Sequence, residues 1–155
     1  MPGQLQSEIK QTKRFDSLEQ EAHLSIERTA AVLTHAFADA LKPFGITSTQ
    51  YNVLRILRGA GDDGLCRNDV RDRLISQMPD VTRLLDRMEE QGLVERERDT
   101  ADRRMVNTRI TREGLRILAR LDEMITEIHH KQLGHMSPAQ LKSLIDLLAI
   151  ARAKP

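Results

Sequence analysis

The chain of 155 residues lacks several features that would point to other classes of protein. It contains one cysteine, Cys66, which excludes an intramolecular disulfide and fits a reducing, cytoplasmic compartment. No apolar run approaches the roughly 20 residues that a membrane-spanning helix needs, and the polar N-terminus lacks the apolar core of a signal peptide. Repeats and Gly/Ser-rich linkers are missing too, so the length predicts a single domain over residues 1–155.

Signatures of catalysis and of metal binding are also missing. There is no Gly-rich phosphate loop and no nucleophile-elbow pattern, and the carboxylates are scattered. His129 and His130 are consecutive, so on a helix they point about 100° apart and cannot chelate together. His23 and His35 lie about three turns apart on one predicted helix. We therefore expect no enzyme, no cofactor and no metal site.

Lysine is absent between Lys42 and Lys131, whereas 15 of the 18 arginines lie between Arg55 and Arg120. The guanidinium group binds phosphates and guanine edges in a bidentate geometry that lysine cannot match. A GC-rich genome would also favour arginine codons, but it accounts less well for a central block. The net charge of +1 argues neither for nor against nucleic acid.

Apolar periodicity predicts a mainly helical chain. Residues 1–14 carry few apolar side chains and are expected to fray. A helix is predicted over 15–41, with Leu18 and Ile26 in its apolar stripe, and further helices begin near residues 48, 68, 79, 112 and 138. Pro79 suits a first helical turn, and Gly92 is placed as the residue that ends the same helix. The two short helices around a break at residues 75–77 are typical of a helix-turn-helix.

Residues 92–111 predict a β-hairpin with an arginine-rich tip. Val106, Thr108 and Ile110 alternate with more polar residues, which is the period of a half-buried strand. Leu65-Cys66 suits a very short additional strand. The predicted order is α-α-α-α-β-β-α-α, a mainly α fold with a small β-hairpin wing, which is a winged helix-turn-helix.

Five segments in this order resemble the MarR family of bacterial transcription regulators. They are Gln50-Tyr51-Asn52-Val53-Leu54, Val81-Thr82-Arg83-Leu84-Leu85-Asp86-Arg87-Met88-Glu89, Gly92-Leu93-Val94, Asp102-Arg103-Arg104 and Ile110-Thr111-Arg112-Glu113-Gly114. The resemblance implies a homodimer that reads a pseudo-palindromic operator in double-stranded DNA, as a repressor released by a small-molecule or stress signal. It implies dimerisation helices in residues 1–44 and 112–155 and a DNA-binding module in residues 45–111.

The helix predicted after Pro79 is then the recognition helix. Thr82, Arg83 and Arg87 lie on its exposed face, where side chains meet base edges in the major groove. Gln77 and Asp80 stand near its start, where the family tends to have small hydroxyl residues. The simplest interpretation of Asp80 is a residue that favours the start of a helix, although a carboxylate can also accept a hydrogen bond from cytosine.

A solvated helix surface is the competing interpretation of these charges. In that case Arg83 pairs with Asp86, or Arg87 pairs with Glu90, and neither arginine serves DNA.

The wing supplies the second predicted contact surface. By position we expect Arg104 to enter the minor groove, Asp102 to orient it and Arg103 to bind phosphate. Arg96 and Arg98 are included as wing contacts, although they alternate with glutamates, so part of that charged set must face away from DNA.

Two other functions stay open. Cys66 allows a thiol-based redox regulator, although a half-buried, unreactive cysteine is the simpler interpretation. A winged helix that binds protein instead of DNA is the other alternative. Apolar stripes on the first helix and the last two suit core, dimer seam or an effector pocket, and the resemblance allows a small-molecule effector.

Overall fold

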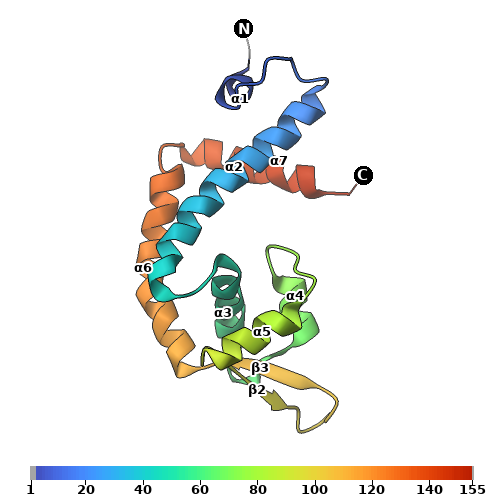
Figure 1. Ribbon diagram of the computed structural model, residues 1–155, viewed down its shortest axis with the longest axis vertical. Helices are drawn as coiled ribbons and strands as arrows, with labels where there is room; N and C mark the ends of the chain where they lie inside the picture. The colour runs from blue at the N-terminus through green and yellow to red at the C-terminus, as the bar shows by residue number, and fades with distance from the viewer. Residues whose placement is uncertain (1–2, 155) are drawn as a thin grey trace. The chain divides into compact units, whose positions relative to one another are not determined.

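The computed structural model describes residues 3–154 of the chain. It divides into two compact units, residues 1–48 and residues 49–155, called the N-terminal unit and the C-terminal unit below. The fold is mainly helical with a small three-stranded antiparallel sheet, which confirms the predicted class (Figure 1).

The N-terminal unit holds α1 (Gln4–Glu8), α2 (Leu18–Leu41) and a 3-10 turn, η1 (Lys42–Phe44). The expectation that residues 1–14 fray is wrong for the described part of that segment. Leu5 and Gln6 are buried, and the Gln6 amide donates to the carbonyl oxygens of Gln11 and Lys13 at 3.3 and 3.1 Å. α1 has five residues, which are too few to show an apolar period, so the sequence pattern could not reveal this helix.

α2 exposes much of its apolar stripe. The helix begins after Ser17, whose hydroxyl accepts the Gln20 backbone N–H, and the chain turns at Gly45, where φ is 69°. Leu18 is 82% exposed and Ile26 is 44% exposed, so these two residues are not part of the core of the single chain. The periodicity identified an apolar face correctly but could not say what covers it.

The C-terminal unit begins with three helices, of which the last two form the helix-turn-helix. They are α3 (Ser48–Ala60), which a 3-10 turn η2 (Gly61–Asp63) follows, α4 (Arg67–Arg73) and α5 (Val81–Glu90). All but one of the residues predicted from their spacing to face inward here are buried, each worth about 1.5–3 kcal/mol for a large apolar side chain. They are Tyr51, Leu54, Leu57, Val70, Val81, Leu84, Leu85 and Met88. Leu74, also predicted to face inward, is half-buried. Pro79 lies before α5, not in its first turn as predicted, because Asp80 caps the helix.

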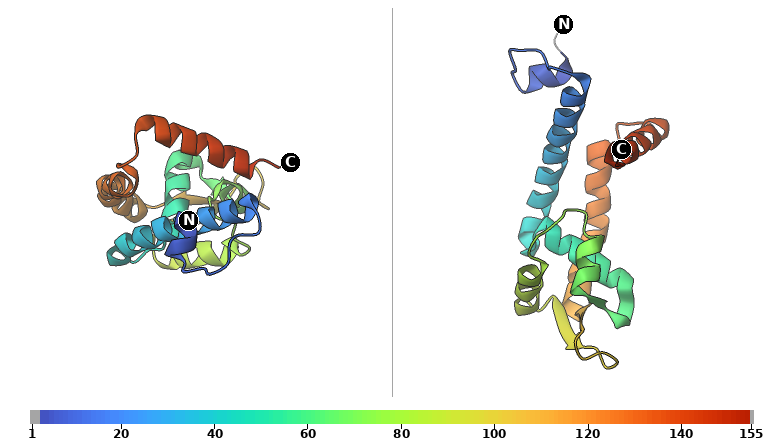
Figure 2. Two further views of the ribbon diagram at one scale, coloured as in Figure 1. Left: turned by 90° about the horizontal axis from the view of Figure 1, so that it is seen from above. Right: turned by 90° about the vertical axis from the view of Figure 1, so that its right-hand side faces the viewer.

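The sheet has the order β1-β3-β2, formed by β1 (Leu65–Cys66), β2 (Val94–Arg98) and β3 (Val106–Ile110). Val94 pairs with Ile110 and Arg96 with Thr108, so these side chains share one face. Val94 and Thr108 are 2% and 1% exposed, which identifies this face as the inner one. The tip of the hairpin extends beyond the helices of its unit (Figures 1 and 2).

One residue joins the hairpin to α6 (Arg112–Leu133). The Thr111 hydroxyl donates to the Gly92 carbonyl at 2.6 Å and accepts the Gly114 N–H at 3.1 Å. A Cβ added at Gly114 would lie 2.6 Å from the carbonyl oxygen of Leu93, so a glycine is needed for this close approach. Gly92, which ends the previous helix at φ 74°, and Thr111 therefore fix both ends of the hairpin together.

A second link joins α6 to α3. Arg58 donates two hydrogen bonds to the Asp122 carboxylate at 2.9 and 3.0 Å, and this bond with the guanidinium lowers the pKa of Asp122. Leu118, Leu121 and Ile125 are buried along α6. The bidentate pair thus fixes the first half of α6 to α3.

Apolar side chains stay exposed on the last two helices. Leu115 on α6 is 42% exposed. On α7 (Pro138–Arg152), which Ser137 and Gln140 cap, the described residues include none that is buried. Ile145 and Ile150 are 64% and 71% exposed. None of the helices described in residues 3–154 is long and apolar enough to cross a membrane.

Replacing Thr111 by Val should destabilise the protein by about 1–2 kcal/mol, because it removes the helix cap and the bond to Gly92. Thermal unfolding should show a midpoint lower by about 2–4 °C per kcal/mol. Thr111→Ser keeps the hydroxyl and is the control; equal melting of both variants would refute a structural role for this hydroxyl.

Candidate nucleic-acid interface

One face of α5 is available to a partner because the opposite face is buried. Thr82, Arg83 and Arg87 are exposed, as predicted for a recognition helix. The Asp80 carboxylate accepts the Arg83 backbone N–H at 3.0 Å, and its other oxygen lies 3.6 Å from Arg83 Nε. Asp80 is therefore a helix-start residue, and Gln77 lies in the loop before the helix.

Two residues that the sequence analysis did not single out support this helix. Arg67, in the first turn of α4, donates to the Thr82 hydroxyl at 3.0 Å. Asn52 on α3 accepts the Ile75 backbone N–H at 2.9 Å and so anchors the loop between α4 and α5. Arg67 belongs to the arginine block, but its partner depends on how two helices cross, which local patterns do not reveal.

The inner face of the hairpin carries an arginine that is bound to α5. Arg96 Nη2 lies 2.7 Å from an Asp86 oxygen, and Arg96 Nε donates to Glu89 at 2.9 Å. The hydrogen bonds to Glu89 and then to Asp86 raise the pKa of Arg96. Arg98, two residues along the same strand, is exposed.

The arginine on the outer face of the hairpin is neutralised by glutamates of the hairpin itself. Arg109 pairs with Glu97, lies 3.9 Å from Glu95, and donates to the Asp62 carbonyl at 3.3 Å. Part of the alternating charge on β2 therefore faces away from α5 and is held in ion pairs, as expected from the alternation.

The wing tip is ordered by two aspartates. Asp99 accepts the backbone N–H groups of Ala101 and Asp102 at 2.7 and 3.1 Å and the Asn107 amide at 3.0 Å. The backbone bonds from Asp102 and Ala101 lower the pKa of Asp99. Asp102 in turn accepts the Arg104 backbone N–H at 3.0 Å. Asp102 thus positions Arg104 through the main chain.

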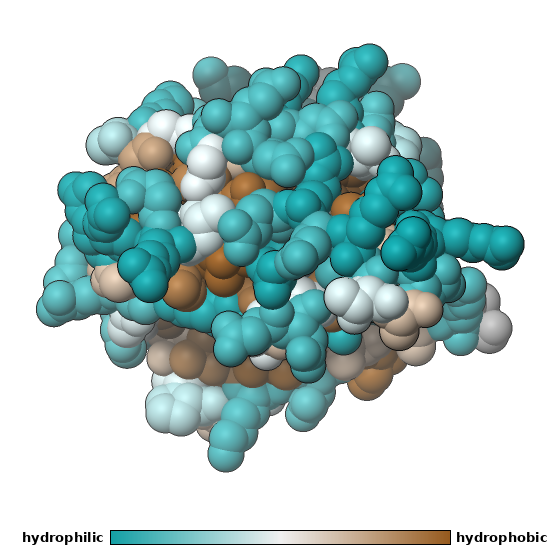
Figure 3. All heavy atoms as spheres, turned by 90° about the horizontal axis from the view of Figure 1, so that it is seen from below, coloured by the Kyte–Doolittle hydropathy of each residue, from teal (hydrophilic) through white to brown (hydrophobic). Residues whose placement is uncertain are grey.

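Four exposed arginines of this surface have no carboxylate partner within residues 3–154: Arg87, Arg98, Arg103 and Arg104. One lies on α5 and three lie on the hairpin. The face drawn in Figure 3 is covered mainly by hydrophilic side chains, with apolar side chains visible between them. Uncompensated guanidinium groups on a hydrophilic surface can bind a polyanion.

Cys66 is half-buried at the end of β1 and has no disulfide partner. The neighbouring guanidinium of Arg67 is directed to the Thr82 hydroxyl. Nowhere in the described part of the chain do three His, Cys, Asp or Glu side chains come together in a way that could hold a metal ion.

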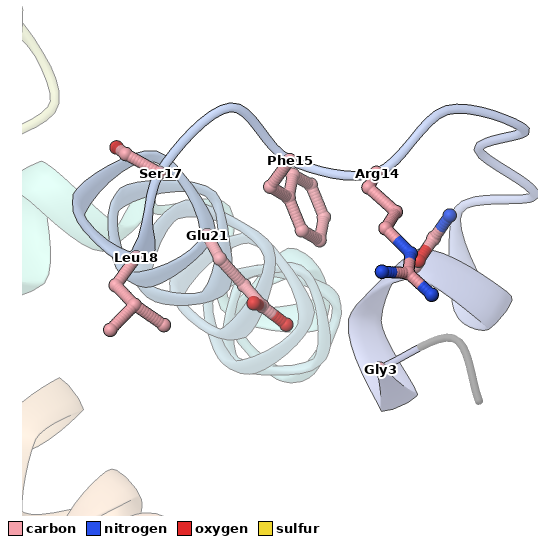
Figure 4. Close-up of a pocket in the computed structure, with 7 residues that line it drawn as sticks. Gly3, Arg14, Phe15, Ser17, Leu18 and Glu21 are labelled. Atoms are coloured by element: carbon pink, nitrogen blue, oxygen red, sulfur yellow. The ribbon is translucent and has the colours of Figure 1, made fainter.

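A hollow of about 390 Å³ lies in the N-terminal unit (Figure 4). Its lining comes from α1, the following loop and the start of α2, and includes Arg14, Phe15 and Glu21. Gln6 also lines it, but the Gln6 amide already bonds the loop carbonyls of Gln11 and Lys13. The hollow holds none of the residues predicted to bind DNA.

Comparison with known proteins shows which family the chain is similar to. A sequence model of the MarR family matches residues 44–105. The HTH-type transcriptional repressor IacR of Pseudomonas putida is 26% identical over 110 residues, which cover 71% of this chain and 65% of that protein, slightly under two thirds of its length.

Solved structures are similar over most of the chain. A MarR transcription factor from Planctomyces limnophilus is 39% identical, with a TM-score of 0.67, over 88% of this chain and 99% of that one. The S. aureus MepR–DNA complex has a TM-score of 0.76 at 22% identity, over 83% of this chain and 94% of that one, and shows the likeness of fold.

Replacing Asp99 by Ala should disorder the wing tip, whereas Asp99→Asn, which can still accept both backbone bonds, should preserve it. Backbone ¹⁵N order parameters of residues 100–104 are the measurement. Because hydrogen bonds lower the pKa of folded Asp99, the ionised carboxylate contributes fully above the unfolded value of about 3.9, and that contribution is lost as the pH falls through the lower folded pKa. A tip that is equally ordered in D99A and D99N would contradict this role.

Proposed function

Because this chain belongs to the MarR family of winged helix-turn-helix transcription regulators, we propose that it acts as a homodimeric repressor. It is a DNA-binding regulator and not an enzyme, as the sequence predicted. In our proposal the dimer reads a pseudo-palindromic operator in double-stranded DNA and is released by a small-molecule or stress signal. IacR, to which it is similar, is named a repressor.

The observation that carries the DNA-binding part is the placement of unpaired arginines. Arg87 on α5 and Arg103 and Arg104 at the wing tip are exposed and free of carboxylate partners within the described residues, although the chain as a whole is nearly neutral. Unpaired arginines on a recognition helix and on a wing can contact two adjacent grooves of DNA, the major groove and the minor groove.

We assign the contacts accordingly. Thr82, Arg83 and Arg87 meet base edges in the major groove, and an arginine there contributes about 1–3 kcal/mol of discrimination. Arg104 enters the minor groove, while Arg103 and Arg98 bind phosphates. Asp80 at the helix start and Gln77 in the loop before it lie within reach of the same groove.

Dimerisation is assigned to residues 1–44 and 112–155, with residues 45–111 as the DNA-binding module. Exposed apolar side chains on α2 and α7, including Val32, Leu147 and Ile150 at 55%, 64% and 71%, support a covered surface there. Two recognition helices held by such a body would enter successive major grooves about 34 Å apart.

DNA binding can be tested with a labelled duplex of mixed sequence. The wild-type protein should bind at low salt, with an affinity that falls steeply as salt rises. Arg104→Ala should weaken binding and make the slope of log K against log salt shallower by about 0.9 for each phosphate that the protein no longer neutralises. Arg152→Ala, which removes the same charge near the end of α7, is the control. A wild-type protein that ignores DNA even in dilute buffer would refute the function.

Sedimentation tests the dimer separately. The wild-type protein should be a dimer at micromolar concentration, and a Leu147→Glu/Ile150→Glu variant should be a monomer, because two carboxylates would be buried at the seam. Lys142→Glu changes the net charge by the same amount and should stay a dimer. A stable wild-type monomer would rule out two coupled half-sites.

A further inference from the structure

α5 carries acidic residues that compete with DNA for its own arginines. Arg83 has an aspartate three residues before it, Asp80, and another three residues after it, Asp86. Both spacings allow ion pairs on a helix surface. If neither aspartate were bound to another residue, both could pair with Arg83. The guanidinium of Arg83 would then be neutralised within the helix and less able to contact bases.

In the structure, Asp86 does not compete for Arg83 because it is bound elsewhere. Asp86 is bound to Arg96 on β2 at 2.7 Å, and the same guanidinium binds Glu89 through Nε at 2.9 Å. The Arg96 side chain is 26% exposed, less than either carboxylate, at 48% and 40%. Arg83 is left with Asp80 alone, at 3.6 Å and 75% exposed.

We propose that Arg96 is a positioning residue that holds Asp86 and Glu89 away from the DNA-binding arginines and fixes the wing strand to the recognition helix. This role replaces the DNA contact expected for Arg96 from the sequence, and it rests on the proposed function. One guanidinium bound to two carboxylates leaves no donor fork for a phosphate, whereas the carboxylates left alone would repel one.

Arg98 provides a comparison within the same strand. It lies two residues from Arg96, so its side chain projects from the same face, but it has no carboxylate partner in the described structure. Arg98 is the phosphate contact on β2 and Arg96 is not. The two residues should therefore respond differently when the acids on α5 are neutralised.

The experiment is a binding cycle on the mixed-sequence duplex. Arg96→Gln should weaken binding about tenfold, the size of a coupling between residues in one ion-pair network. Neutralising the acids as well, in R96Q/D86N/E89Q, should restore most of the affinity and return the salt slope to that of the wild type. An R96K variant can hold one carboxylate and should lie between these values.

Charge alone must be excluded as the cause of the rescue. R96Q/E90Q/E123Q has the same net charge as the rescued variant but leaves Asp86 and Glu89 unneutralised, so it should bind clearly less well than R96Q/D86N/E89Q. Equal rescue by both triple variants would overturn the proposal.

A direct contact by Arg96 would give a different pattern. Affinity would stay low in R96Q/D86N/E89Q, and the salt slope would stay shallower by about 0.9 for each phosphate left without its cation. Arg98→Gln should show this second pattern, with no rescue by D86N/E89Q.

A measurement without DNA separates this proposal from the proposed function. In the wild type, the NMR signal of Arg96 Nε–H should exchange slowly with water and that of Arg83 should exchange fast. In R96Q the Arg83 signal should slow, because Asp86 becomes its partner, and it should be fast again in R96Q/D86N/E89Q. An Arg83 signal that is identical in all three proteins would overturn the sequestration of Asp86, whether or not the protein binds DNA.

Discussion

The one-sided burial of α5 is the constraint on which the proposed interface depends. Val81, Leu84, Leu85 and Met88 are at most 7% exposed, and this burial determines the rotation of the helix about its axis. Once that rotation is set, the side chains of Thr82, Arg83 and Arg87 face outward. The packing of the apolar core thereby determines which polar side chains of the helix are exposed to a partner.

The arginines of the C-terminal unit fall into two groups, those bound to carboxylates and those that stay exposed. Arg58, Arg96 and Arg109 are bound to carboxylates and hold elements of the unit together. Arg103 and Arg104 stay exposed on a tip whose backbone is ordered by Asp99 and Asp102. A nearly neutral chain can thus present a cationic surface, because most of its negative charge near that surface is already bound.

How far the sequence predicts this structure depends on the range of each interaction. The stripe of α5, the glycine after it and the Thr111 cap follow from spacings within a few residues, and all three were predictable. The partner of Arg96 was not, because Asp86 and Glu89 lie on another element and meet it only after the hairpin packs. The role of Leu18, Leu115 and Ile150 stayed open for a related reason: periodicity identifies an apolar face, but what covers that face depends on tertiary or quaternary contacts.

The single-residue connection at Thr111 has a mechanical consequence. β3 ends at Ile110 and α6 begins at Arg112, so no flexible linker separates the hairpin from a helix of 22 residues. A rotation of α6 about its own axis must therefore displace the wing tip by an arc that grows with its distance from that axis. Torsion in this helix would thereby be converted into displacement of the tip and of the arginines that it carries.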